Sequence, residues 1–115
     1  SKHEFKIVDE SGKPVSRAKV EYFRSVSREY GNPWIPEKPA FTGKTDANGI
    51  WKLDDSPYGF ISNWTANGAV MFKVTSGDTV RYGWMNITDF NLEYWRGHKD
   101  TGYYTVQVTP YDNQK

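Results

Sequence analysis

The sequence predicts an all-β domain, an antiparallel two-sheet β-sandwich of about seven to eight strands. Short runs in which apolar and polar residues alternate with a period of two recur along the chain, separated by clusters of Gly, Pro, Asn, Asp and Ser. No segment has the apolar spacing of an amphipathic helix. So many short strands in 115 residues are better accommodated by two packed sheets than by one open sheet.

The first two strands are expected within residues 5–22. Phe5 and Ile7 belong to the first, and the Ser-Gly-Lys-Pro sequence at residues 11–14 ends it. The second alternates between an apolar and a charged face, as in a sheet with one solvated side. Its apolar face is Ala18, Val20 and Tyr22, and its charged face is Arg17, Lys19 and Glu21.

A long loop and a tight turn are expected next. Residues 25–39 contain three prolines and show no sustained period, which predicts the loop. Residues 41–45 and 50–53 flank the sequence Asp-Ala-Asn-Gly at 46–49. Because an Asn-Gly pair readily takes positive φ values, these two runs are expected to form a β-hairpin.

The C-terminal half predicts three more strands. A second irregular segment at residues 54–68 comes before them, and a third at residues 86–102 interrupts them. Their apolar faces are Val70, Phe72 and Val74; Val80, Tyr82 and Trp84; and Tyr104, Val106 and Val108, ended by Pro110. Trp84 is in phase with its apolar neighbours and Trp51 with Leu53, so both are expected in the core.

The composition limits the classes of partner. The chain has the size of one domain, residues 1–115, with linker-like ends at 1–3 and 111–115 expected from a longer polypeptide. A formal net charge of +1 argues against nucleic acid as a partner. No run approaches the roughly 20 apolar residues of a membrane span, so no membrane insertion is expected. Absence of cysteine excludes disulfides and thiolate chemistry.

Two motifs carry a family resemblance. Gly12-Lys13-Pro14-Val15 with Ala18-Lys19-Val20 follows the pattern G-x-P-V-x-x-A-x-V, and residues 45–49 follow T-D-x-N-G. In these the chain resembles the carboxypeptidase regulatory-like, transthyretin-like domains, and more loosely Cna B-type and bacterial immunoglobulin-like repeats. The resemblance implies a sandwich that serves as an accessory module of secreted or cell-surface bacterial proteins, and it implies no reaction.

In Cna B-type domains an internal isopeptide bond often joins a first-strand Lys to a last-strand Asn or Asp, so the resemblance makes such a bond a candidate feature of this chain. Lys6 matches the first position. The last strand carries Gln107 and has no Asn or Asp before Asp112, so the bond is not expected.

Catalysis, cofactors and metals are not expected. A Ser-His-acid arrangement would have to use His3 in a frayed terminus or His98 in a turn. Acidic residues suited to glycoside hydrolysis are explained as solvated loop residues; they are Asp54, Asp55, Glu93 and Asp100. A weak calcium site would combine Asp46 and Asn48 with Asp54 and Asp55, but a turn explains residues 46–49 without metal.

Aromatic residues are in excess, with five Trp, eight Tyr and six Phe in this short chain. Three tryptophans stand beside turn-forming residues, where an exposed ring can stack on a sugar while nearby polar groups bind its hydroxyls. The predicted ligand-binding residues are Trp34, Trp64, Trp95, Tyr30, Tyr58, Tyr94, Arg96 and Asn63.

The function predicted from these features is non-catalytic. The chain is expected to be a module of a secreted or cell-surface protein that binds a polysaccharide or glycan, beside neighbouring domains of the same polypeptide. The alternative is a structural spacer or protein-interaction domain, in which the same aromatic rings cover the open ends of the core. The two differ in whether the loop tryptophans are exposed.

Overall fold

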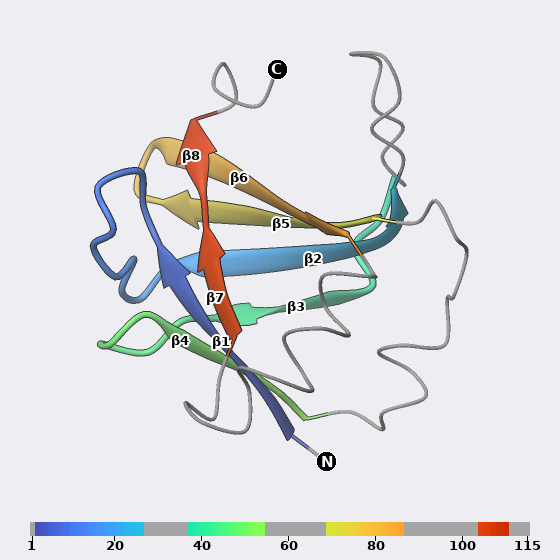
Figure 1. Cartoon of the computed structure of the whole chain (residues 1–115), viewed down its shortest axis with the longest axis horizontal. Helices are drawn as coiled ribbons and strands as arrows, with labels where there is room; N and C mark the ends of the chain where they lie inside the picture. The colour runs from blue at the N-terminus through green and yellow to red at the C-terminus, as the bar shows by residue number, and fades with distance from the viewer. Residues whose placement is uncertain (1, 27–36, 55–68, 87–103, 111–115) are drawn as a thin grey trace.

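The computed structural model describes residues 2–26, 37–54, 69–86 and 104–110 (Figure 1). These residues form eight strands and no helix, which confirms the all-β, two-sheet class. The strands are β1 (Lys2–Val8), β2 (Lys19–Val26), β3 (Phe41–Lys44), β4 (Ile50–Asp54), β5 (Ala69–Ser76), β6 (Thr79–Asn86), β7 (Tyr104–Gln107) and β8 (Thr109–Pro110). A membrane-spanning helix is therefore absent from the described residues.

The strands form a sheet of three, in the order β4-β1-β7, and a sheet of five, in the order β3-β2-β5-β6-β8 (Figure 1). One pair of neighbouring strands departs from the antiparallel pairing that was expected, because β1 and β7 run parallel. Parallel neighbours need a long connection between them. These two strands come from opposite ends of the chain, a relation that local sequence patterns do not report.

The predicted hairpin at residues 46–49 is also wrong, although the turn itself exists. Strand β3 pairs with β2 and strand β4 pairs with β1, so the chain crosses from one sheet to the other at this turn. Gly49 has a φ of 80°, whereas Asn48 has no positive φ. A two-residue hairpin of the Asn-Gly type needs positive φ at both residues, so this backbone does not fold β3 onto β4.

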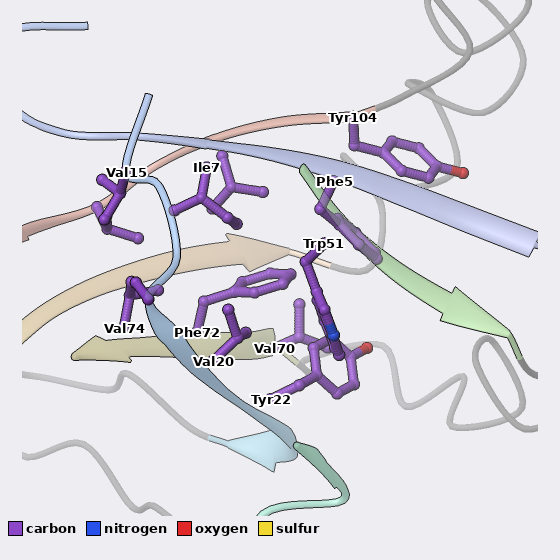
Figure 2. Close-up of a cluster of buried hydrophobic side chains, with 13 residues drawn as sticks. Phe5, Ile7, Val15, Val20, Tyr22, Trp51, Val70, Phe72, Val74 and Tyr104 are labelled. Carbon is purple, nitrogen blue, oxygen red and sulfur yellow. The ribbon is translucent and has the colours of Figure 1, made fainter. Parts of the chain in front are cut away.

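Five aromatic rings lie between the sheets, packed with eight aliphatic side chains (Figure 2). The ring of Phe5 lies 5.5 Å from that of Trp51, 5.1 Å from Phe72 and 5.3 Å from Tyr104, measured between centroids. Phe72 also meets the ring of Tyr22 edge-on at 5.2 Å. All five side chains are buried, as the alternation predicted for them. Tilted and edge-on contacts of this kind stabilise a core beyond simple burial of apolar area.

Strand β6 presents the opposite face from the one predicted. Trp84 is half-buried rather than in the core, and it packs with Phe23, Met71 and Tyr82 in a second, separate cluster. Gly83 faces the core side of β6, and there is no room for a side chain there, because an added Cβ would lie 2.7 Å from the Gln107 carbonyl oxygen. The chain passes from β7 to β8 over this glycine, so β6 has no large side chain there.

Candidate functional site

The two ends of the sandwich differ. One end, which we name the turn end, holds the connections at residues 9–18, 45–49 and 77–78. The other, the loop end, holds the ends of β2, β5 and β6, where Val26, Ala69 and Asn86 lie in one row across the sheet. The first residue of β1 and the last of β4 are also paired at the loop end, as Lys2 and Asp54.

Two turns at the turn end have the same hydrogen bonds. Asp9 Oδ1 accepts the backbone N–H groups of Ser11 and Lys13 at 2.8 and 3.0 Å. Asp46 Oδ1 accepts those of Asn48 and Ile50 at the same two distances. Each turn ends in a glycine of positive φ, 81° at Gly12 and 80° at Gly49. The sequences Asp-Glu-Ser-Gly and Asp-Ala-Asn-Gly therefore encode one turn twice.

These bonds decide the role of the Asp46 carboxylate. The backbone N–H groups of Ile50 and Asn48 lower the pKa of Asp46 below its ordinary value. The described residues contain no group of three or more His, Cys, Asp or Glu side chains placed to hold a metal ion. Asp54 lies at the end of β4, at the loop end, whereas Asp46 lies at the turn end. Asp46 and Asp54, two residues of the calcium site considered from the sequence, therefore lie at opposite ends of the sandwich. Asp55 lies outside the described residues.

Thr45 joins the two halves of the turn end. Its hydroxyl donates to the Val15 carbonyl at 2.7 Å and accepts the Ala18 N–H at 2.8 Å, and the residue is only 4% exposed. The Arg17 N–H donates to the Asp46 carbonyl at 3.1 Å. The motifs that carry the family resemblance thus hold the connection between β1 and β2 against the turn after β3.

An ion pair joins Arg81 of β6 to Glu10 in the connection between β1 and β2, at the turn end. The Arg81 guanidinium donates to both Glu10 carboxylate oxygens, at 2.9 and 3.1 Å, and this contact lowers the pKa of Glu10 below its ordinary value. Gln107 Nε2 donates to the carbonyls of Asp9 and Glu10 at 3.3 and 3.4 Å. The turn end therefore has a structural explanation for each of these side chains.

Substitution of Gly49 tests this packing. An alanine Cβ at Gly49 would lie 2.9 Å from Pro14 Cβ and 3.0 Å from the Ile7 carbonyl oxygen, whereas one at Gly12 would meet nothing within 4 Å. Because the two φ values match, Gly12→Ala is expected to cost about 1 kcal/mol and Gly49→Ala at least about 2 kcal/mol. Urea denaturation of both variants measures the difference, and equal losses would contradict the contact with Pro14.

The eight predicted ligand-binding residues all lie outside the described residues. They belong to three segments, residues 27–36, 55–68 and 87–103, and each segment is entered from the loop end, after β2, β4 and β6. The strands that resume the described chain at Ala69 and Tyr104 also start toward the loop end.

Other predicted residues are placed by the strands. Lys2 and His3 belong to β1, opposite Asp54 and Leu53, rather than to a linker or a frayed terminus. Lys6 lies beside Thr105 of β7, and no Asn or Asp occurs among the described residues of β7 and β8. Asp55, Glu93, His98, Asp100 and Asp112 lie outside the described residues.

A second surface, which we name the outer face, is the side of the five-stranded sheet that points away from the core. Sequence reasoning predicted only its part on β2, the charged face with Lys19 and Glu21. Its residues alternate with the buried Val20, Tyr22, Phe72 and Val74 along the strands. Three cross-strand rows make it up. From the loop end they are Phe23, Met71 and Trp84; then Thr42, Glu21, Lys73, Tyr82 and Thr109; then Lys44, Lys19, Thr75 and Val80. Phe23 and Met71 of the first row are buried, so they belong to this side of the sheet but not to its exposed surface.

Comparison of the sequence with protein-family models and with curated proteins returned no match. The resemblance to carboxypeptidase regulatory-like and Cna B-type domains therefore stays a prediction based on residues 12–20 and 45–49. The fold class, by contrast, follows directly from the strands and their pairing.

Proposed function

We propose that this chain is a non-catalytic accessory module of a secreted or cell-surface protein, and that it binds carbohydrate through aromatic side chains of its three long connections. One observation carries the proposal. The strand ends that lead into residues 27–36, 55–68 and 87–103 all lie at the loop end. Those three connections contain every one of the eight candidate residues.

The distribution of roles between the two ends supports this proposal. At the turn end, polar side chains such as Thr45, Asp46 and Glu10 are committed to hydrogen bonds within the fold. Among the described residues, the large apolar core is formed by side chains of the strands together with Val15, Ala18 and Val108. Binding residues often lie on loops that a rigid scaffold presents.

The chemistry follows from the residue types. The ring faces of Trp34, Trp64 and Trp95 offer flat apolar surfaces for the C–H face of a pyranose ring. Arg96 and Asn63 offer donors, and Asn63 also an acceptor, for sugar hydroxyls. Tyr30, Tyr58 and Tyr94 combine a ring with a hydroxyl. No step of bond cleavage is part of this proposal.

A binding screen against soluble and insoluble polysaccharides tests the proposal. Each of Trp34→Ala, Trp64→Ala and Trp95→Ala is compared with the wild type, and Trp51→Phe serves as a tryptophan substitution in the core, outside both the three connections and the outer face. A contributing ring is expected to lower affinity at least about tenfold when it is removed, while the control keeps wild-type affinity. Near-ultraviolet circular dichroism establishes that each variant is folded.

The same screen decides between the proposal and its alternative. If the wild type binds no polysaccharide and a soluble quencher reaches none of Trp34, Trp64 and Trp95, the aromatic residues of the three connections are structural. The chain is then a spacer or protein-interaction module. Trp51 is 3% exposed and provides the internal reference for a shielded ring.

A further inference from the structure

The outer face carries an unusual pair of charges. Lys19 and Lys44 are directly opposite each other on β2 and β3, and both are exposed. Directly opposed residues have Cβ atoms about 5 Å apart, and like charges in such positions destabilise a sheet. Among the described residues no ion pair involves either lysine, since the two that occur are Lys52 with Glu4 and Arg81 with Glu10.

Neighbouring residues add to the positive charge. Lys73 lies in the next row of the outer face, opposite Glu21 on one side and Tyr82 on the other. Glu21 is the one carboxylate that the described residues contribute to the three rows, against three lysines. The outer face is therefore complementary to an anion that lies across β3, β2 and β5.

The uncharged residues of the outer face indicate what kind of anion it suits. Tyr82 is half-buried and is the cross-strand partner of Lys73, so an aromatic and a basic residue are neighbours in this row. Thr42, Thr75 and Thr109 place hydroxyl groups in the same rows. Tyr82 and Lys19 lie two strands apart, about 10 Å across the sheet. A sugar ring that bears its own carboxylate matches an aromatic surface next to a lysine, and an extended chain of such sugars matches the rows.

We propose that the outer face binds an acidic polysaccharide, with Lys19, Lys44 and Lys73 pairing with carboxylates on its sugar rings. This inference rests on the proposed function, because it names the class of carbohydrate. It adds a surface that the loop residues do not include. Charge complementarity between three lysines and a polyanion is the observation that supports it.

The test uses polygalacturonate and its methyl ester, which has the same backbone without free carboxylates. The wild-type chain is expected to bind polygalacturonate at about 20 mM salt, to lose most of that affinity at about 300 mM salt, and to bind the ester weakly. The double variant Lys19→Gln/Lys44→Gln is expected to lose about tenfold in affinity. The variant Lys13→Gln/Lys52→Gln removes the same charge elsewhere and is expected to bind as the wild type does.

Stability separates lost binding from lost folding. Removal of two opposed like charges is expected to leave the melting temperature of Lys19→Gln/Lys44→Gln unchanged or slightly raised. Equal losses of affinity in the two double variants would overturn the inference, because net charge alone would then explain binding. Equal affinity for poly-glutamate would overturn it as well, since the outer face would then recognise charge and not sugar.

Comparison with the tryptophan variants distinguishes this inference from the proposed function. Binding that the lysine pair does not affect but that Trp34→Ala, Trp64→Ala or Trp95→Ala abolishes would overturn the outer face and keep the loop site. Binding lost in the lysine variant and kept in all three tryptophan variants would support the outer face and reject the loop site. Failure of the wild type to bind any polysaccharide would overturn both.

Discussion

Replacement of Phe72 by alanine is expected to destabilise the fold by about 3 to 5 kcal/mol. Phe72 is fully buried on β5, and its ring contacts those of Phe5, Tyr22 and Trp51 at 5.1, 5.2 and 6.1 Å (Figure 2). Truncation removes the transfer free energy of the ring and leaves a cavity between the two sheets. A loss of this size is a large part of the free energy of unfolding of an ordinary domain, which is about 5 to 15 kcal/mol.

Urea denaturation measures this loss, with two controls on the same strand. Phe72→Leu keeps much of the volume and is expected to cost clearly less than the alanine variant. Lys73→Ala, which alters the next residue on the outer face, is expected to change stability by no more than about 0.5 kcal/mol. A cost below about 1 kcal/mol for Phe72→Ala would be incompatible with a central position between the sheets.

Replacement of Thr45 by valine is expected to destabilise the fold by about 2 to 4 kcal/mol. Valine has nearly the same shape as threonine, so the packing is kept and the hydroxyl is lost. The Val15 carbonyl and the Ala18 N–H would then both lose the partner that they have at 2.7 and 2.8 Å. A buried polar group without a partner costs about 1 to 3 kcal/mol.

Thr45→Ser is the matched control, since it keeps the hydroxyl and removes one methyl group, at a cost of about 1 kcal/mol. Amide hydrogen exchange at Ala18 gives a local reading, because the Ala18 N–H donates to the hydroxyl in the folded protein. Exchange there is expected to accelerate in Thr45→Val beyond the effect of global stability, and not in Thr45→Ser. Indistinguishable exchange in the two variants would show that the hydroxyl does not hold this connection.

Much of the fold follows from local patterns. The alternation on β1, β2, β5 and β7 assigned the buried face of each strand, and these side chains are in the core. Thr-Asp-Ala-Asn-Gly predicted a turn at residues 46–49, where Asp46 binds two backbone N–H groups. Such features depend on residues close together in the sequence, which is why a single sequence reveals them.

The candidate sites, too, could be predicted from the sequence only in part. The excess of aromatic residues is visible in the composition, and the three segments that hold the predicted ligand-binding residues are visible as breaks in periodicity. The charged face of β2 was predicted, but the lysine pair of the outer face was not, because Lys19 and Lys44 are 25 residues apart and become neighbours only when β2 pairs with β3. Trp84 was assigned to the wrong face because the orientation of β6 also depends on residues distant in the sequence, those between β7 and β8. A glycine at position 83 leaves room for the chain between β7 and β8, so the apolar face of β6 points outward.

By itself, the sequence determined that the chain is an all-β domain with a strongly aromatic core and tight turns at fixed positions, because period-two alternation and turn chemistry act over a few residues. Only the tertiary structure decided which strands are partners, so that β3 and β4 belong to different sheets and β1 lies parallel to β7. That choice depends on the fit of side chains from distant segments, such as the rings of Phe5, Trp51 and Phe72 between the sheets. No short stretch of sequence contains these contacts, and they decide that the strand ends leading into residues 27–36, 55–68 and 87–103 lie at the loop end.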